Sequence, residues 1–285
     1  MPAATTHVEF AKDVYQSSEF LKENVKNKQL FWLGSQGPDV LFFSRMSILP
    51  GSLRKYGNMM HEKKVSEVIT FFDSYVKEVP ELKSYFYGYL CHYALDSHVH
   101  PLVYGVTHDQ YLKHGGKEGL IHVDVESEID VWVLNHKGKN IEDYDVFHYL
   151  YVEKRDAELL AKMYHEMFKA VFDLDVATKT ICSAITEIHT YTKLLYPKKT
   201  TYHLFYGIES LMNNHFVTAM MLYGKKVGPI INLDHKTYSL PWNKDETISA
   251  SFPELYDEAL KYAQEIVKAP MNFSYTKTFD GQLVN

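Results

Sequence analysis

Histidine and carboxylate side chains recur at four-residue intervals in the first half of the chain. His92, Asp96 and His100 follow one another at this spacing, and His122 and Glu126 repeat it further along. On an α-helix, residues four apart lie above one another on a single face. Each stretch would therefore direct several metal-ligand atoms toward one point without needing a loop to bend them there.

A polar helix face in contact with solvent is the ordinary alternative explanation for any one of these pairs. Apolar residues, however, flank both stretches, which a solvated face does not need. Two histidine–carboxylate pairs and a terminal histidine in such surroundings favour a metal site. The flanking apolar residues are Phe86, Leu90, Leu95, Ile121, Val125 and Ile129.

A further candidate ligand, His7, lies near the N-terminus. It follows Thr6 in the pattern Thr6-His-Val-Glu9, which is typical of a capping box at the start of a helix. In a first helical turn, the positive end of the helix dipole disfavours an imidazolium and so favours a neutral ligand. A surface histidine at a helix start is the simpler explanation for His7 when it is considered alone.

An acidic residue, Asp39, closes a turn that the sequence Gly34-Ser-Gln-Gly37-Pro38 favours. Large apolar residues on both sides anchor this turn in the core. Asp39 is therefore either the N-cap of the following segment or a functional carboxylate. A predicted loop over residues 44–58 follows, and His61 is expected to open a helix that continues through Val76.

The composition is that of an ordinary globular protein, and it restricts the partners. The chain has 285 residues, of which 46% are hydrophobic and 23% are charged, and its formal net charge is −6. This charge argues against nucleic-acid binding through a basic face. A phosphate substrate stays open, because bound cations would change the local sign. The two cysteines, Cys91 and Cys182, form no CxxC pattern and predict neither a disulfide framework nor a thiolate metal site.

No signal for export or membrane anchoring stands out in the sequence. The N-terminal residues lack a basic stretch followed by an apolar one. No apolar run approaches the ~18–20 residues of a membrane span. We therefore expect a chain without a transmembrane segment that remains in the cytoplasm.

The central helix, which must position His92 and Asp96, is predicted from about Leu82 to Val99. Pro101 would end it and leave His100 at a frayed terminus. Residues 103–119 would then form a loop, in which His108 and His114 are expected to be exposed.

Helices are also predicted for most of the remaining chain. No β-hairpin signal and no repeat stands out, so we expect an all-α fold with many helices in a single domain over residues 1–285. The other helices are expected at about residues 6–26, 121–134, 155–173, 177–196, 203–223 and 252–268, with a loop at 232–242 and an irregular tail from Pro270.

Taken as an ordered set, the candidate ligands resemble the motifs of the zinc-dependent phospholipase C family, whose fold is shared with the fungal single-strand nucleases. The resemblance covers about residues 5–135 and implies a cluster of two to three zinc ions in a central cleft. By motif, Asp39, His61, His92 and Asp96 would hold one zinc, and His100, His122 and Glu126 would hold a second. His7 and a bridging Asp96 would serve a third. In secreted members the mature N-terminal residue also ligates the third ion, whereas here six residues precede His7.

This donor set suits the hydrolysis of a phosphate ester. Nitrogen and carboxylate ligands without thiolate are typical of catalytic zinc, which leaves positions open for water and substrate. Three divalent ions would outweigh the charge of Asp39, Asp96 and Glu126, and the excess positive charge would attract a phosphodiester. The expected nucleophile is a water whose pKa zinc lowers from ~15.7 toward ~7. Asp39 is the catalytic candidate, either as the acceptor of its proton or as a ligand.

The leading hypothesis is therefore phospholipase C-type cleavage between glycerol and phosphate, with three alternatives. A nuclease or phosphomonoesterase on the same scaffold would make nucleic acid a substrate, and four tyrosines would then stack bases or fill the core. An HD-type phosphohydrolase needs an adjacent His–Asp pair on a helix, whereas His108-Asp109 is expected in a loop. A non-enzymatic helical protein with a structural metal needs four ligands, fewer than the eight candidates. The four tyrosines are Tyr85, Tyr89, Tyr93 and Tyr104, and Trp242 is a candidate for the edge of the cleft.

Overall fold

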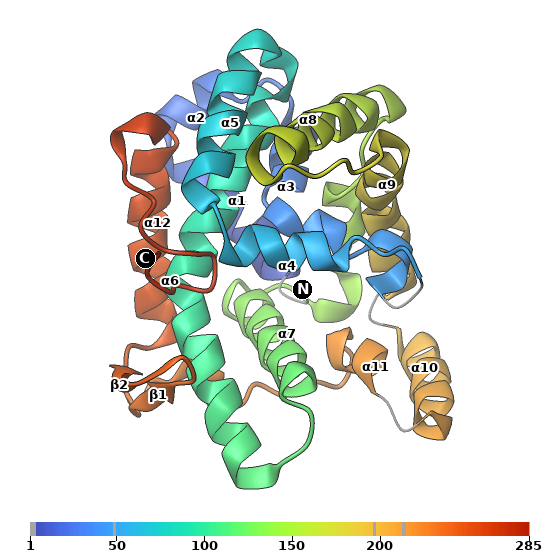
Figure 1. The fold of residues 1–285 in the computed structure, drawn as a ribbon. Helices are drawn as coiled ribbons and strands as arrows, with labels where there is room; N and C mark the ends of the chain where they lie inside the picture. The colour runs from blue at the N-terminus through green and yellow to red at the C-terminus, as the bar shows by residue number, and fades with distance from the viewer. Residues whose placement is uncertain (1–3, 48–49, 196–197, 213–214, 285) are drawn as a thin grey trace. The chain divides into compact units, whose positions relative to one another are not determined.

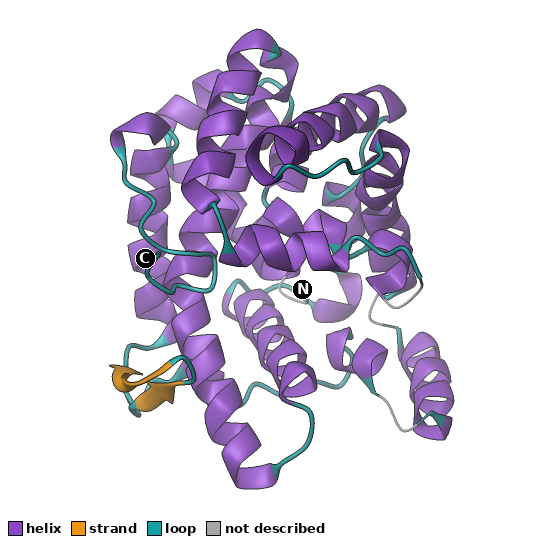
Figure 2. Ribbon diagram, viewed as in Figure 1, coloured by secondary structure: helices purple, strands orange, loops and turns teal. Residues whose placement is uncertain are grey.

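The structure, a computed structural model, describes residues 4–47, 50–195, 198–212 and 215–284. Among these residues it contains twelve α-helices, several 3₁₀ turns and one two-stranded antiparallel sheet (Figure 2). The predicted all-α fold is thus confirmed. None of the helices in the described ranges is both long enough and apolar enough to cross a bilayer. The helices are α1 (Ala4–Ser17), α2 (Glu19–Asn24), α3 (Lys28–Gly34), α4 (Arg54–Glu62), α5 (Val65–Glu78), α6 (Lys83–His114), α7 (Glu118–His136), α8 (Lys154–Phe172), α9 (Thr178–Leu194), α10 (Lys199–Leu211), α11 (Phe216–Met220) and α12 (Phe252–Ile266), and the strands are β1 (Tyr238–Leu240) and β2 (Asn243–Ile248) (Figure 1).

The chain divides into two compact units, which we describe separately. The His92 unit comprises His7–Ser97, Phe147–Tyr191 and the residues from Ala259 onward. The His100 unit comprises the residues up to Thr6, His98–Val146 and Thr192–Glu258. The expectation of a single domain over residues 1–285 stays a prediction.

The helix α6 continues through Pro101, so the helix end predicted there is wrong. Pro101 has no N–H to donate and its ring crowds the preceding turn, which together cost about 3 kcal/mol. Leu102, Val103 and Val106 beside it are at most 1% exposed. Since burial of each such side chain stabilises by about 1.5–3 kcal/mol, packing offsets the cost of the proline. His100 therefore lies within a helix rather than at a frayed end.

The C-terminal end of α6 lies at His114, so most of the loop predicted over residues 103–119 is helical. Gly115 follows with a φ of +70°, a conformation that commonly ends helices and that residues with a Cβ seldom adopt. His114 is exposed, as expected. His108 is half-buried instead, and its Nδ1 lies 3.0 Å from Oε1 of Glu118.

The capping box predicted at Thr6 is wrong. Thr6 lies within α1, and its backbone N–H and its hydroxyl both donate to Oδ1 of Asp130, at 2.7 and 2.6 Å. Glu9 instead accepts a hydrogen bond from Lys12. The carboxylate of Asp130, which lies on α7, thus stabilises the end of α1 where the helix dipole favours a negative charge. This helix ends at Ser17, and α2 follows as a separate helix where one helix to residue 26 was expected.

His61 lies at the end of one helix rather than at the start of the next. It belongs to the last turn of α4, and Lys64, with a φ of +54°, separates α4 from α5. The loop predicted over residues 44–58 is shorter, because α4 begins at Arg54. Residues 48–49 of that range lie outside the described part of the chain.

The hairpin β1–β2 lies in a region predicted to have no strand, so that expectation is wrong. Tyr238 pairs with Ile248, and both side chains lie against Gly105 of α6. In β1 only Tyr238 and Leu240 are buried, which is too short an alternation to be recognised in the sequence.

The other predicted helices are confirmed with one exception. Those at about 121–134, 155–173, 177–196 and 252–268 correspond to α7, α8, α9 and α12. The one predicted at 203–223 is two helices, α10 and α11. Residues 196 and 213–214 of these ranges lie outside the described part of the chain.

Two glycines let α3 and α6 cross in close contact in the His92 unit. A Cβ on Gly34 would collide with the carbonyl oxygen of Tyr85, and one on Gly88 would collide with that of Phe31. Only glycine permits backbones to approach this closely. The crossing places the turn that follows α3 next to the part of α6 that carries His92.

Candidate metal centre

The helix α6 carries His92 and Asp96 one turn apart, and both side chains are buried. Their exposed fractions are 0% and 3%. The Nε2 atom of His92 lies 2.9 Å from Oδ2 of Asp96. A carboxylate this far from water needs a positive charge nearby to offset its loss of hydration.

Asp39 and His61 form a first group with His92 in the His92 unit. The Nε2 atom of His61 lies 3.1 Å from Oδ1 of Asp39 and 3.8 Å from Oδ2 of Asp96. One ligand atom from each of Asp39, His61 and His92 lies within 4.8 Å of the others. Gly37 helps to place Asp39, because it has a φ of +50° and a Cβ there would collide with the His92 ring.

Backbone carbonyls fix the orientation of two of these imidazoles. The Nδ1 atom of His92 donates to the carbonyl oxygen of Ser35 at 3.0 Å, and that of His61 donates to the carbonyl oxygen of Gly57 at 2.9 Å. In the neutral rings each Nε2 atom then carries a lone pair. Among the described residues, Nε2 of His92 has no hydrogen-bond partner. A positive charge, either a proton or a metal ion, must therefore lie between these nitrogens and the carboxylates.

His7, on α1, forms a second group with His92 and Asp96. Its ring stacks on that of His92 with the centroids 4.1 Å apart, and its Nε2 lies 3.2 Å from Oδ1 of Asp96. The side chain is only 3% exposed, so His7 is not a surface residue. Asp96 thus presents one oxygen to His7 and the other to His92, which is the geometry that a bridging carboxylate needs.

In the first group the pKa of the Asp39 carboxyl is lowered, and the pKa values of the two imidazoles are shifted in opposite directions. Burial would raise the pKa of Asp39, but among the described residues the contact with His61 and the nearby His92 help to lower it to about 2. Burial lowers the pKa of His92, which favours its neutral form. Burial acts in the same way on His61, but Asp39 and Asp96 outweigh it and raise its pKa. Protonation of His61 is therefore the main competitor of a cation in this group.

A third group, His100, His122 and Glu126, lies in the His100 unit. The Nε2 atoms of the two imidazoles lie 3.4 and 3.5 Å from Oε1 of Glu126. Burial would raise the pKa of Glu126, but His122 and His100 help to lower it well below its usual range. The ring of Tyr104 lies 4.8 Å from that of His122 and 5.4 Å from that of Trp242. The hairpin residue Trp242 thus reaches this group through Tyr104.

The C-terminal segment, predicted as an irregular tail, contacts the first group. The N–H of Phe279 donates to the carbonyl oxygen of His61 at 3.0 Å, and its ring lies 5.2 Å from the ring of His61 and 5.5 Å from that of His92. Phe279 is fully buried, and Asp280 beside it is 7% exposed. Sequence reasoning missed both residues, because they have no periodic spacing relative to the other candidates.

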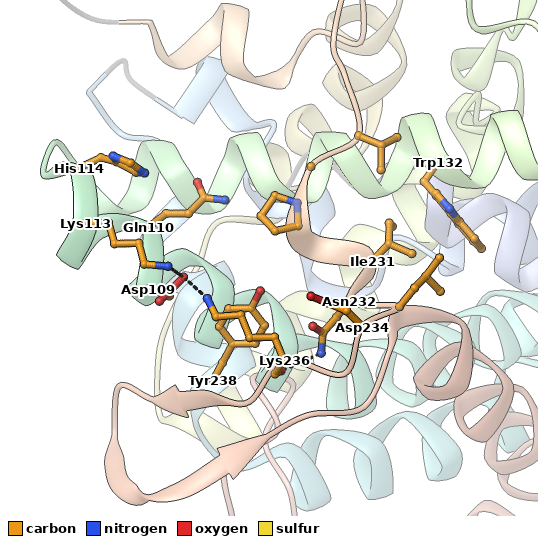
Figure 3. A pocket seen from close by; sticks show the side chains of 14 residues that line it. Asp109, Gln110, Lys113, His114, Trp132, Ile231, Asn232, Asp234, Lys236 and Tyr238 are labelled. Atoms are coloured by element: carbon orange, nitrogen blue, oxygen red, sulfur yellow. Dashed lines mark hydrogen bonds and ion pairs between the residues drawn. The ribbon is translucent and has the colours of Figure 1, made fainter.

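A separate cavity in the His100 unit contains none of the eight candidate ligands (Figure 3). Its volume is about 660 Å³. His108-Asp109, expected in a loop, lies on α6, and Asp109 lines this cavity. Lys113 and Lys236 both donate to the Asp109 carboxylate, at 2.8 and 2.7 Å. Asp109 is thus paired with cationic side chains, which speaks against an HD-type metal site.

The donors in the three groups fit zinc. Each group combines imidazole nitrogens with one carboxylate, and neither Cys91 nor Cys182 belongs to any of them. Three protein ligands in a group leave a further coordination position for water or substrate, as in catalytic zinc sites. His92 belongs to two of the groups, and the one lone pair on its Nε2 can bind only one ion at a time. The unpartnered Nε2 of His92 is an atom that such an ion would contact.

Comparison with known proteins identifies the family. Residues 6–183, more than half of the chain, match the family described as zinc dependent phospholipase C. The chain belongs to this family, in agreement with the motifs in its sequence. Membership and the three donor groups together support a metal-dependent hydrolase. A search of curated proteins and a search of solved structures each found no match.

Asp96→Asn is expected to remove more bound zinc than any other single ligand substitution, because Asp96 contacts His7, His61 and His92. Elemental analysis of the purified protein should give two or more zinc ions per chain for the wild type. Loss of a ligand should weaken zinc at the affected group by at least about 100-fold. Glu126→Gln should therefore empty the His100 group alone, and His7→Ala should lose at most one ion.

His98→Ala is the control for Asp96→Asn. His98 lies on the same helix, is only half-buried and belongs to none of the three groups. It should retain the zinc content of the wild type. If the two variants held equal amounts of zinc, the assignment of Asp96 as a shared ligand would be wrong.

Phe279→Leu is expected to speed the release of zinc to a chelator by about tenfold, the lower end of the effect of residues that support metal ligands. The smaller side chain would let the His61 and His92 rings move while keeping the segment apolar. Phe273→Leu is the matched control, because its ring contacts Tyr262 rather than a candidate ligand. Identical release rates in the two variants would show that Phe279 does not support the group.

Proposed function

We propose that this chain is a zinc-dependent phosphodiesterase of the phospholipase C type, which hydrolyses the bond between glycerol and phosphate in a phospholipid. One observation carries the proposal. The carboxylates of Asp39 and Asp96 lie 3.1 and 2.9 Å from the Nε2 atoms of His61 and His92. Lone pairs and carboxylate oxygens repel one another at this distance unless a positive charge, either a proton or a metal ion, lies between them. Family membership supports zinc as that cation.

The charge balance of the three groups favours an anionic substrate. Three divalent ions would exceed the combined charge of Asp39, Asp96 and Glu126, and the excess would stabilise the negative charge that develops on a phosphoryl group. When bound, zinc supplies a Lewis acid and lowers the pKa of water from ~15.7 toward ~7. The protein's part is to hold the donors in place, and the Nδ1 hydrogen bonds of His61 and His92 do this before any ligand arrives.

Asp39 could act as a ligand or as a proton acceptor, and its environment favours the first role. A pKa of about 2 keeps its carboxyl ionised at neutral pH, which both roles require. General bases work best when their pKa lies near the working pH. A carboxylate this acidic therefore holds a proton only briefly, and we propose that Asp39 ligates metal and at most passes a proton on to solvent.

Single-stranded nucleic acid is the second candidate substrate, because one aromatic pair borders the His100 group. Tyr104 is half-buried and contacts both His122 and Trp242. The other three tyrosines considered for base stacking, Tyr85, Tyr89 and Tyr93, are at most 2% exposed and belong to the core. A nuclease usually presents several stacking platforms, so the burial of these rings favours the phospholipid.

The zinc-loaded protein is expected to hydrolyse a short-chain phosphatidylcholine to diacylglycerol and a phosphorylated headgroup. The same preparation should be assayed with a phosphomonoester and with single-stranded DNA. A chelator should abolish the activity, zinc should restore it, and Asp39→Asn should lower kcat by at least about 100-fold. Cleavage of DNA or of the monoester without cleavage of the lipid would reject the phospholipase assignment.

Activity is expected to fall below about pH 6, because protons displace metal from imidazole ligands. The direction follows from His61: the opposing effect of burial is outweighed by Asp39 and Asp96, which raise its pKa. As the pH falls, His61 therefore takes up a proton earlier than an isolated imidazole would. Zinc retained after dialysis and the rate of hydrolysis should decline together over this range. A rate that still rose at about pH 4 would count against a histidine-ligated centre.

A further inference from the structure

The helix α10 presents apolar side chains to solvent. Leu204, Ile208 and Leu211 are 62%, 46% and 91% exposed, and Met212, the residue after the helix, is 70% exposed. This spacing places them along one side of the helix. Helices at the surface of soluble proteins turn such a stripe toward the core. Single exposed leucines are common, whereas a contiguous apolar patch marks an interaction site.

The opposite side of α10 attaches it to the rest of the His100 unit. Glu209, 6% exposed, accepts hydrogen bonds from the backbone N–H groups of Val217 and Thr218 at 2.6 and 2.9 Å. The Thr218 hydroxyl also donates to the Glu209 carboxylate, at 2.7 Å. On this same side the ring of Tyr202 contacts that of Tyr223, and the ring of Tyr206, which is 49% exposed, contacts that of His215. Polar and aromatic groups thus hold the helix in place while its apolar stripe faces outward, the reverse of the usual arrangement.

The sequence on both sides of the stripe is rich in lysine although the chain is acidic. Between Thr192 and Lys226 the sequence contains five lysines and one glutamate, without aspartate or arginine, in a chain whose formal net charge is −6. One of the five, Lys225, is paired with Asp124. The single glutamate is the buried Glu209, which caps α11. Lys198 and Lys199 lie exposed at the N-terminal end of α10. An apolar stripe with lysines beside it matches the surface of an anionic bilayer in both polarity and charge.

We propose that α10 docks the protein on a phospholipid bilayer, with Leu204, Ile208, Leu211 and Met212 in the boundary between headgroups and acyl chains. The inference rests on the proposed function, because a phospholipid must be reached at the bilayer surface. In the His100 unit, α11 packs against both α10 and α7 (Figure 1). The hydroxyl of Ser127, on α7, donates to the carbonyl oxygen of Ala219, on α11, at 2.8 Å. Docking through α10 therefore also orients the helix that carries His122 and Glu126.

Co-sedimentation of the full chain with vesicles tests the proposal. The wild type is expected to bind vesicles of phosphatidylcholine and phosphatidylglycerol. Each Leu→Ser substitution should weaken binding by about tenfold, so the double variant Leu204→Ser/Leu211→Ser should lose about 100-fold. Lys199→Gln should lose about fivefold on these vesicles and nothing on phosphatidylcholine alone.

Leu112→Ser is the matched control, because Leu112 is 70% exposed and lies on α6, outside the stripe. The double variant should keep its zinc content and its rate on a water-soluble phosphodiester, which shows that it is folded. Equal vesicle binding by the double variant and the control would overturn the proposal. So would a dimer of the wild type that the double variant lacks, without vesicle binding, because a second copy would then cover the stripe.

The docking proposal and the proposed function can fail separately. Binding to vesicles through α10 by a protein that hydrolyses no phosphodiester would support docking and reject the phospholipase assignment. Hydrolysis of soluble substrate by a wild type that binds no vesicles would reject docking alone.

Discussion

Buried carboxylates that share a small space with imidazoles require a compensating positive charge, and this constraint organises the His92 unit. Asp39 and Asp96 are 7% and 3% exposed, and neither can be hydrated as a free ion would be. Three imidazoles surround them, and the Nδ1 atoms of His61 and His92 are already committed to backbone carbonyls. These hydrogen bonds leave the Nε2 atoms of both rings facing the carboxylates. With neither a proton nor a metal ion between them, the carboxylate oxygens and the imidazole lone pairs would repel one another.

The candidate ligands could be predicted from the sequence because their signal is local. The four-residue spacing of His92 and Asp96, and of His122 and Glu126, holds on any helix, whatever its tertiary surroundings. Errors in helix boundaries did not affect these residues. His61 lies in the last turn of α4 instead of the first turn of α5. Its contact with Asp39 depends on its position in space and not on the helix to which it belongs. Whether these residues ligate metal stays a prediction.

Other features could not be predicted, because they depend on contacts between distant parts of the chain. Pro101 breaks helices in isolation, and only the buried residues around it keep α6 continuous. The sequence predicts a capping box within α1 at Thr6, whereas Asp130 of α7 accepts the hydrogen bonds from Thr6. Phe279 reaches His61 and His92 from the far end of the sequence. Neither periodicity nor spacing encodes such contacts, since each depends on how the helices pack.

Residues outside the family match contact the candidate ligands or a neighbour of them. All eight candidate ligands lie within the matched residues 6–183. Phe279 and Trp242 lie outside the match, yet Phe279 packs on two imidazoles and Trp242 packs on Tyr104. The helix α10, also outside it, carries the exposed apolar stripe. The matched part thus supplies the candidate donors, and the C-terminal part supplies aromatic residues that pack on them or on Tyr104.

The net negative charge of the chain bears on the proposed binding of an anionic bilayer and of a phosphate substrate. A protein with a formal net charge of −6 is repelled by an anionic bilayer and by phosphate groups. At physiological ionic strength, however, screening reduces this repulsion beyond about 8 Å. Within that distance local charge matters most, and the exposed lysines at the start of α10 and the proposed metal ions in the donor groups would both be locally positive. The overall charge is therefore compatible with the phospholipid substrate and the bilayer docking that we propose.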